Sequence, residues 1–355
     1  MAGRLNTRLT ELLGCEYPVI QTAMGWVADP KLVAATCNAG GFGFLAGATI
    51  PPEEMEQRII ETKQLTDKPF GVNFHMYQPN AADIIEMVIR HGVRAVSYSR
   101  SPGKAMISQL KDAGVVCMPT VGALKHAVKA VEMGADVVTV QGGEGGGHTG
   151  AVPTTILLPQ VIDAVDVPVV ACGGFKDGAG LVAALAYGAE GIAMGTRFLM
   201  TKDSPVPAET LDRYVKVNNP AAVIISRSID GMPQRMINNE LLAQLEKAGP
   251  LKRLMMAVSS GLAYRKYTGM SIAQLFRSAI QMRSGGQMTA AQTIMAANAP
   301  MVIQKAMVDG KPAEGVLPAG QIAGAIDSLL SCDELINEIV RDAEASLERL
   351  CGTRG

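Results

Sequence analysis

The stretch 137–150 carries the residues best placed to do chemistry. Four β-favouring residues, 137–140, predict a buried strand that runs into six glycines interrupted by Glu144, His148 and Thr149. Glycines let backbone N–H groups approach a ligand closely, and His148 is one of only four histidines in the chain. The pattern predicts that His148 lies at the carboxyl end of a strand, which is where the active sites of parallel α/β barrels are found.

Two other interpretations of this stretch stay open at the level of sequence. Gly145, Gly147 and Gly150 fit the G-x-G-x-x-G pattern of a dinucleotide-binding turn, but such a turn opens a helix directly, and here Val152 and Pro153 intervene. The loop could also be an ordinary surface loop in which His148 has no role.

The elements that must position this loop alternate along the first 200 residues. Helical segments begin near Asp29, Pro52, Ala81, Pro102, Leu124, Thr154 and Asp177, several with a proline or a capping residue. Between them lie eight short Val/Ile-rich runs, which we predict to be strands: 19–21, 42–45, 70–73, 95–98, 115–118, 137–140, 167–171 and 191–194. Eight such units in series predict a closed (β/α)8 TIM barrel.

In a barrel of this kind the loops after strands seven and eight often hold a phosphate. The seventh predicted strand ends in Gly173-Gly174, and the eighth ends in Gly195-Thr196. Glycine N–H groups, the Thr196 hydroxyl and the start of a short helix after it would together form a cup for an anion. The alternative is that the glycines only permit tight turns.

Two amides end strands where a core strand would have apolar residues. Asn73 ends the third predicted strand, and Gln141 follows the sixth. An amide both donates and accepts hydrogen bonds, which suits the edge of a flavin or nucleobase ring. Hydrogen bonding within the barrel is an equally good explanation of each amide.

The composition narrows the classes of function. Of the 355 residues 48% are hydrophobic, and 32 basic residues balance 33 acidic ones, so nothing indicates binding to nucleic acid or to a membrane surface. Six cysteines lie far apart without C-x-x-C spacing, which argues against a metal site and favours reduced thiols in the cytoplasm. The N-terminus has no apolar segment, and no run is long enough to span a membrane. The oligomeric state stays open, a homo-oligomer included.

Residues 203–310 do not continue the alternation. We expect a barrel made of 1–202 and 311–355, with 203–310 as a mostly helical insertion over a hydrophobic substrate cleft. Unbranched methionines suit such an adaptable surface, although ordinary helix core is the better explanation for most of them individually. The methionines are Met232, Met236, Met255, Met256, Met270, Met282, Met288, Met295, Met301 and Met307.

A closing helix is predicted after Ser331. Ser331 and Glu334 have capping-box spacing, and apolar residues then recur at helical intervals. These residues are Leu335, Ile339, Ala343, Leu347 and Leu350. The helix should pack its apolar stripe against the barrel.

Taken together, these motifs resemble one known family. The stretches 21–29, 38–43, 69–73, 141–150, 173–174, 195–198 and 317–324 are similar, in order, to nitronate monooxygenase (2-nitropropane dioxygenase-like) proteins, which are FMN-dependent (β/α)8 barrels. The resemblance implies that His148 is the active-site histidine. It also implies FMN contacts from Ala23, Met24, Gly25, Asn73, Gln141, Gly146, Gly150, Gly173, Gly174, Gly195, Thr196 and Gln321. A second glycine pair, Gly285-Gly286, fits the late family motif less well than Gly320-Gln321.

The resemblance is closer to one branch of the family than to others. Monooxygenase members usually have Ala-Pro-Met where this chain has Thr22-Ala23-Met24, and the stretches 24–29 and 65–73 look more like FMN-dependent enoyl-acyl carrier protein reductases. The chain also looks similar to actinobacterial members that act on coenzyme A thioesters in steroid degradation.

The resemblance therefore implies hydride transfer between NAD(P)H and a bulky apolar unsaturated carbonyl compound or thioester, in either direction. Nitronate monooxygenase, enoyl-acyl carrier protein reductase and a non-catalytic flavin-binding protein are the alternatives. Six basic residues of the insertion could meet the phosphates of a coenzyme A handle, although solvated helix faces explain any one of them better. They are Arg227, Arg235, Lys252, Arg253, Arg265 and Lys266.

Overall fold

Eight parallel strands form the centre of the molecule. The computed structural model describes residues 5–75, 80–99, 103–249 and 298–352. Each strand pairs with the next around a closed barrel, and the last pairs with the first. The strands are β1 (Val19–Gln21), β2 (Phe42–Leu45), β3 (Gly71–His75), β4 (Ala95–Ser99), β5 (Val116–Val121), β6 (Val138–Gln141), β8 (Val169–Cys172) and β9 (Gly191–Met194). All eight expected strands are present, which confirms the (β/α)8 prediction.

The fifth strand is longer than the sequence suggested. The predicted strand ends at residue 118, directly before Pro119, which has no N–H to donate to a neighbouring strand. In the structure β5 continues through Pro119, which lies opposite Tyr98 of β4, to Val121, which pairs with β6. The neighbouring strands on both sides therefore override the local signal.

Helices alternate with the strands as predicted. Asp29 and Asp177 each accept a hydrogen bond from the first turn of the helix that follows, as expected of capping residues. The helices around the barrel are α1 (Arg8–Leu13), α2 (Pro30–Asn38), α3 (Met55–Leu65), α4 (Ala81–Arg90), α5 (Lys104–Asp112), α6 (Leu124–Glu132), α7 (Thr154–Ile162), α8 (Gly178–Ala186) and α9 (Thr196–Leu199).

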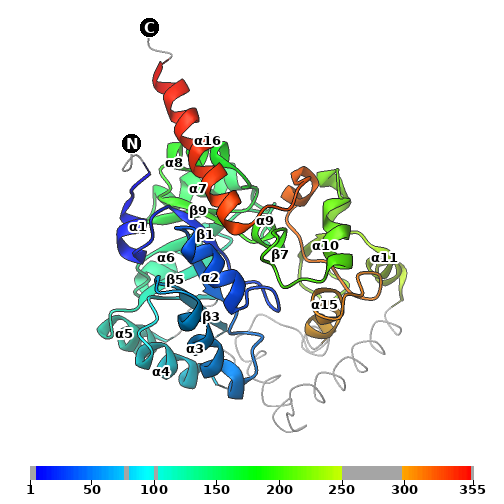
Figure 1. Ribbon diagram of the computed structural model, residues 1–355, viewed down its shortest axis with the longest axis horizontal. Helices are drawn as coiled ribbons and strands as arrows, with labels where there is room; N and C mark the ends of the chain where they lie inside the picture. The colour runs from blue at the N-terminus through cyan, green and yellow to red at the C-terminus, as the bar shows by residue number, and fades with distance from the viewer. Residues whose placement is uncertain (1–4, 76–79, 100–102, 250–297, 353–355) are drawn as a thin grey trace.

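The closing helix α16 (Cys332–Gly352) packs against α8 and α2 and extends beyond the barrel (Figure 1). Its capping box is formed: the Ser331 N–H donates to Glu334 Oε2 at 2.8 Å, and the Glu334 N–H donates to Ser331 Oγ at 3.1 Å. A side chain at Gly178 of α8 would lie 2.3 Å from backbone atoms of α16, so glycine allows the two helices to approach this closely. The apolar stripe is buried only over its first part, and Leu350 is exposed.

The described part of the insertion is not as helical as we expected. It contains α10 (Ala208–Val215), α11 (Glu240–Lys247) and α15 (Asn298–Met307), but also the antiparallel strands β10 (Val223–Ser226) and β11 (Gln234–Ile237). β11 also pairs with β7 (Gly147–His148), so the hairpin forms a three-stranded sheet with the glycine loop of the barrel. All four residues of β11 are buried, the polar Gln234 and Arg235 among them, so this strand does not alternate between a buried and an exposed face.

The insertion lies to one side of the barrel, with β7 between them in Figure 1. Met236 is fully buried in a small core with Leu242, Leu245, Val302 and Val316. Met307 instead joins the large core of the barrel. These two methionines are ordinary core residues. The expected domain boundaries at 202/203 and 310/311 stay a prediction, and Val316 packs with residues of the insertion.

Candidate active site

The glycine loop after β6 is held in place by its own polar residues. Gln141 Nε2 donates to the carbonyl oxygens of Gly146 at 3.3 Å and His148 at 3.0 Å. The Glu144 carboxylate accepts from the backbone N–H of Thr154 at 3.0 and 3.1 Å, which places a negative charge at the start of α7. Glu144 therefore caps a helix. The loop has a defined shape and is not an unconstrained surface loop, and it leads into β7 and not directly into a helix, as a dinucleotide-binding turn would.

His148 lies on β7, seven residues after the end of β6, with a side chain that is 55% exposed. Its Nε2 is 2.7 Å from Oδ2 of Asp230. Asp230 is buried, and its two oxygens also accept from Gln234 Nε2 at 2.5 Å and from the Met232 N–H at 3.0 Å. The described chain thus presents one partly exposed imidazole backed by a buried carboxylate.

Asp230 was not among the residues we selected from the sequence. The signal for it exists, because Asp230-Gly231 lies between the β-favouring runs 223–226 and 234–237, and Asp-Gly between such runs is typical of a hairpin turn. The prediction that 203–310 is mostly helical is inconsistent with this hairpin pattern and was wrong here. The contact with His148, 82 residues earlier, depends on the tertiary structure.

Arg235 contradicts our expectation for the basic residues of the insertion. It lies on β11 and is buried, with Nε donating to the Gly143 carbonyl at 2.9 Å and Nη1 to the Val223 carbonyl at 3.1 Å. Burial lowers the pKa of the guanidinium, and the nearby Glu144 opposes that effect. Arg235 therefore lies on a strand and is buried, and not on a solvated helix face as the alternative expectation had it. Arg227 is exposed.

The glycine loops proposed for the cofactor converge at one end of the barrel. Gly173 and Gly174 have φ of +99° and +84°, a conformation that other residues rarely adopt. A Cβ on Gly173 would lie 3.2 Å from the Gly145 nitrogen, and one on Gly146 would lie 2.6 Å from the Gly320 nitrogen. Loops far apart in sequence therefore approach each other at positions that only glycine can occupy.

Thr196 and the late motif complete this end of the barrel. Thr196 Oγ1 accepts from the Gly320 N–H at 2.9 Å, and the Gln321 N–H donates to the Glu144 carbonyl at 2.9 Å. A Cβ on Gly195 would lie 3.0 Å from Thr22 Oγ1 and 3.5 Å from Met24 Sδ. The loops after β1, β6, β8 and β9 and the 320 segment are thus neighbours. Most of the expected cofactor contacts here are half-buried, as loops around a ligand cavity should be: Ala23, Met24, Gly25, Gln141, Gly146, Gly150, Gly173, Gly195 and Gln321.

The two amides predicted at strand ends are bonded within the barrel. Gln141 does end β6, but Asn73 lies in the middle of β3, which continues to His75. Asn73 Nδ2 donates to the carbonyl and the hydroxyl of Ser97, both at 3.0 Å, and Ser97 is its partner in the β3–β4 register. Gln141 uses its amide N–H groups on the glycine loop. Contact of either residue with a ring stays a prediction, and it would involve the amide oxygens.

Cys172 ends β8 beside the glycine pair but is not an available nucleophile. It is buried, and this burial raises the pKa of the thiol to about 12. A thiol this far from ionisation has little thiolate at neutral pH. His148 therefore remains the candidate for proton transfer at this end of the barrel.

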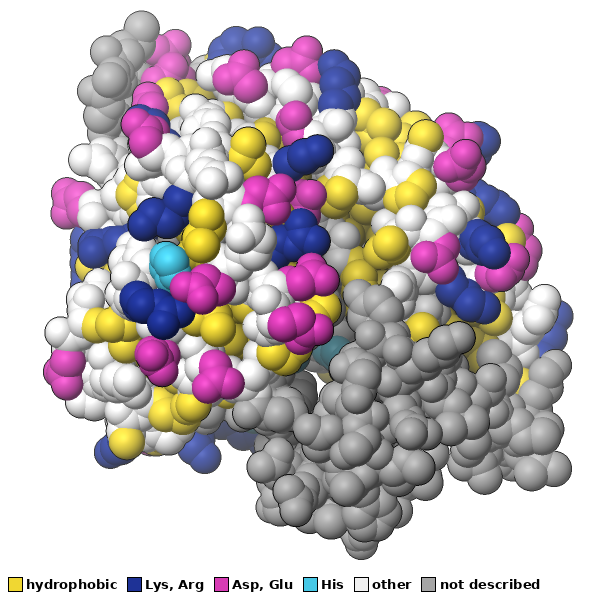
Figure 2. Space-filling model, turned by 60° about the horizontal axis from the view of Figure 1, so that its bottom comes forward, with side chains coloured by type: hydrophobic (Ala, Val, Ile, Leu, Met, Phe, Trp, Pro, Cys, Tyr) yellow, Lys and Arg dark blue, Asp and Glu magenta, His cyan; other side chains and the backbone are white. Residues whose placement is uncertain are grey.

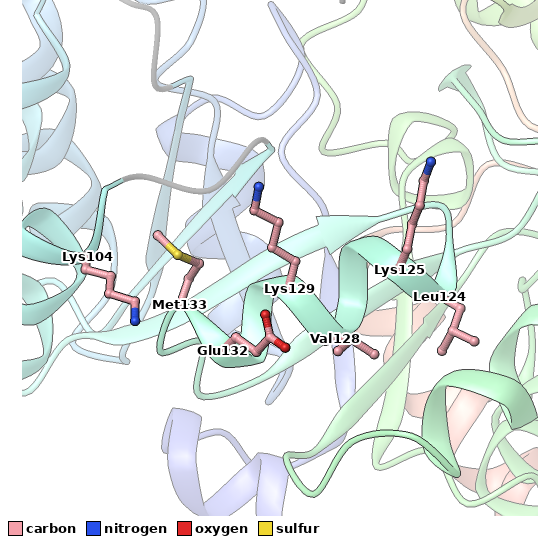
Figure 3. Close-up of a pocket in the computed structure, with 7 residues that line it drawn as sticks. All are labelled: Lys104, Leu124, Lys125, Val128, Lys129, Glu132 and Met133. Carbon is pink, nitrogen blue, oxygen red and sulfur yellow. The ribbon is translucent and has the colours of Figure 1, made fainter.

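A separate hollow of about 620 Å³ lies between α5 and α6 on the outside of the barrel (Figure 3). Lys104, Lys125 and Lys129 line it, along with Leu124, Val128, Glu132 and Met133. It contains none of the residues expected to bind a cofactor, so we do not place the active site there. On the face of the molecule shown in Figure 2, acidic and basic side chains are interspersed, with no extended patch of one sign.

Several expected residues lie outside the described part of the chain. They are Lys252, Met255, Met256, Arg253, Arg265, Lys266, Met270, Met282, Gly285, Gly286, Met288 and Met295. No helix among the described residues is long and apolar enough to cross a membrane.

Comparison with known proteins decides the family. The family model described as nitronate monooxygenase matches residues 6–342. The chain belongs to the nitronate monooxygenase family. It is therefore an oxidoreductase, of a family whose members use FMN.

Individual relatives differ in how much of the chain they match. A protein of Rhodococcus jostii, named (3aS,4S,5R,7aS)-5-hydroxy-7a-methyl-1-oxo-octahydro-1H-indene-4-carboxyl-CoA dehydrogenase, is 49% identical over 99% of both chains. A protein of Mycobacterium tuberculosis with the same name is 48% identical over 97% of this chain and 98% of its own. A probable nitronate monooxygenase of Staphylococcus saprophyticus is 32% identical over 69% of this chain and 82% of its own.

Two solved structures are similar to this chain over nearly its whole length. FabK from Thermotoga maritima superposes with a TM-score of 0.81 at 29% identity, over 98% of this chain and 99% of that one. A nitroalkane oxidase from Streptomyces ansochromogenes superposes with a TM-score of 0.72 at 26% identity, over 96% and 99%. Both cover the insertion as well as the barrel.

Proposed function

We propose that this family member is an FMN-dependent dehydrogenase of a bulky, apolar acyl group carried as a coenzyme A thioester, in which His148 is the catalytic base. The observation that carries the proposal is the 49% identity, over 99% of both chains, to a protein named as a dehydrogenase of a bicyclic carboxyl-CoA. A second relative with that name supports it over 97% of the chain. A ring fragment of a steroid is the substrate class that these names suggest.

The barrel end fits FMN better than a larger flavin nucleotide. The glycine pair Gly173-Gly174, with positive φ at both residues, adjoins the loop that carries Gly195 and Thr196. Glycine loops of this kind bring backbone N–H groups close to one terminal phosphate. We infer that these residues hold the phosphate, while the half-buried loops at Met24, Gln141 and Gln321 contact the ring.

FMN, when bound, supplies a two-electron acceptor for the hydride that leaves the substrate. The protein itself supplies the base that removes the substrate proton. The carbon next to a thioester carbonyl carries the more acidic hydrogen, and the partly exposed His148 imidazole is the group beside the glycine loop that could accept it. Loss of that proton and of a hydride from the neighbouring carbon leaves a double bond. In this direction reduced FMN would pass the hydride on to NAD(P)+, and in the reverse direction NAD(P)H would reduce the flavin.

The main competitor is nitronate oxidation, which uses the same kind of base. It is supported by the family model and by the Staphylococcus saprophyticus relative. That relative matches only 69% of this chain, whereas the two dehydrogenases match 97% or more. The reverse reaction, reduction of an enoyl thioester, would use the same residues, with His148 returning the proton.

Two experiments test the proposal. Mass spectrometry of the cofactor released by heat should find FMN. FAD or no flavin would contradict the inference that the loops at Gly173-Gly174 and Gly195-Thr196 hold the phosphate of FMN. Anaerobic flavin reduction by a panel of thioesters should then favour the saturated bicyclic acyl-CoA over short-chain acyl-CoA. Equal rates across the panel would contradict a bulky apolar substrate.

A further inference from the structure

The contact between His148 and Asp230 leaves one nitrogen of the imidazole available. Nε2 is 2.7 Å from Asp230 Oδ2, while Nδ1 has no hydrogen-bond partner among the residues that the structure describes. The side chain is 55% exposed, so little packing restrains the ring. The orientation of His148 therefore depends largely on the carboxylate.

The carboxylate is itself held rigidly. Gln234 Nε2 donates to the same oxygen, Oδ2, at 2.5 Å, and the Met232 N–H donates to Oδ1 at 3.0 Å. Gln234 lies directly opposite His148 in the β11–β7 register, and the Thr149 N–H donates to the Pro233 carbonyl at 3.3 Å. The hairpin thus places the buried Asp230 carboxylate beside the imidazole, and Gln234 and the Met232 N–H fix the orientation of that carboxylate.

A carboxylate that only accepts hydrogen bonds determines which tautomer its histidine adopts. Asp230 Oδ2 requires a hydrogen on Nε2, and a neutral imidazole with Nε2–H has its lone pair on Nδ1. We infer that Asp230 is a positioning residue that holds neutral His148 in the Nε2–H tautomer, so that Nδ1 is the atom that accepts the substrate proton. The role in catalysis rests on the function proposed above, but the tautomer does not.

The charges around the imidazole are consistent with this role. When Nδ1 accepts the proton from the carbon next to the thioester, the ring becomes positive and faces the buried Asp230 carboxylate. Two other charged groups near the glycine loop, Glu144 and Arg235, have partners of their own. Glu144 is bonded to the Thr154 N–H, and Arg235 is bonded to the carbonyls of Gly143 and Val223.

A purely structural role for Asp230 makes a different prediction. Asp230 also shapes the turn, through Oδ1 and the Met232 N–H. Asp230→Asn keeps an acceptor for that bond but replaces Oδ2 with an NH2 group, which donates and so favours the Nδ1–H tautomer. Ser228→Ala is the matched control, because Ser228 is in the same turn and its hydroxyl donates to Glu246 at 2.8 Å without contact to His148.

Nitrogen-15 NMR of histidine-labelled protein reads the tautomer without substrate. With four histidines in the chain, His148→Ala assigns the relevant signal. Near pH 8 we expect the Nε2–H tautomer in the wild type and in Ser228→Ala, and its loss in Asp230→Asn. An Nδ1–H tautomer in the wild type, or an unchanged signal in Asp230→Asn, would overturn the inference.

A double-mutant cycle tests the consequence for catalysis. Asp230→Asn should slow flavin reduction by saturating acyl-CoA about 100-fold while the substrate dissociation constant stays within about twofold, and it should cost nothing further in a His148→Ala background. Additive losses would overturn the positioning role. If the wild type reacts with no acyl-CoA at all, the proposed function fails, whereas the NMR result still decides the tautomer.

Discussion

Arg235 Nε donates to the carbonyl oxygen of Gly143 at 2.9 Å, across 92 residues of sequence. The same guanidinium donates to Val223, so one buried side chain joins the glycine loop of the barrel to both strands of the hairpin. The insertion therefore helps to shape the loop that carries His148. Since β11 also pairs with β7, the site is built jointly by the barrel and the insertion.

Arg235→Lys should loosen this connection. An ammonium group cannot reproduce the two diverging hydrogen bonds of a guanidinium, so the free energy of unfolding should fall by about 1–3 kcal/mol and flavin should dissociate more readily. Denaturant unfolding and flavin fluorescence measure the two effects. Arg213→Lys, at an exposed ion pair with Glu240, is the control and should change stability by no more than about 0.5 kcal/mol. Equal effects of the two variants would contradict the role of Arg235.

Gly173→Ala should release the cofactor. Its φ of +99° disfavours a side chain by about 1–2 kcal/mol, and the new methyl group would lie 3.2 Å from the Gly145 nitrogen. We expect the protein to be purified with less flavin and to have a dissociation constant for FMN raised at least about tenfold. Gly92→Ala is the control, because Gly92 also has positive φ, +62°, but open space around it. If Gly92→Ala lowers the affinity for FMN as much as Gly173→Ala does, the loss comes from general instability, and the role of Gly173 in binding FMN is contradicted.

His148→Ala should keep the flavin and lose turnover. In the proposed role the imidazole moves a substrate proton, so flavin reduction by substrate should slow by on the order of a hundredfold or more, with the visible spectrum unchanged. Stopped-flow absorbance measures this rate. His126→Ala, an exposed histidine of α6, should behave as wild type. An unchanged rate in His148→Ala would show that the loop histidine has no catalytic role.

The cysteines should differ sharply in reactivity. Burial raises the pKa of the Cys15, Cys37, Cys117, Cys172 and Cys332 thiols to about 12. At pH 8 these five thiols are almost entirely protonated, and they become ionisable only as the pH approaches 12. The exposed Cys351 should therefore be alkylated first in the native protein, as peptide mass spectrometry can show. Rapid labelling of Cys172 at pH 8 would contradict the buried environment at the end of β8.

The barrel could be predicted from the sequence because its signals are local. Short Val/Ile-rich runs predict the strands, and Asp29 and Asp177 are residue types that commonly cap helix starts, which their side-chain bonds to the first turn confirm. The hydrogen-bond partners of polar side chains could not be predicted, because they are far away in the sequence. Asn73 was recognised as an unusual amide, but its bonds to Ser97 follow from the register of β3 and β4.

The hairpin of β10 and β11 is a second case in which a residue's role depends on a distant partner. Its strands and its Asp-Gly turn are visible in the sequence, yet the surrounding helical pattern and the many methionines favoured a helical lid. Asp230 contacts His148 only because β11 pairs with β7. A residue whose role depends on a partner 82 positions away cannot be found from spacing alone.

The most direct test of the proposed function is anaerobic single-turnover reduction of the bound flavin. The purified protein is mixed, without oxygen, with a saturated bicyclic carboxyl-CoA, with the same acid lacking coenzyme A, and with a short alkyl nitronate, and flavin absorbance is followed. We predict that the thioester bleaches the flavin at least about tenfold faster than either of the others and that the product is the unsaturated thioester. Faster bleaching by the nitronate than by the thioester would contradict the proposal and favour nitronate oxidation.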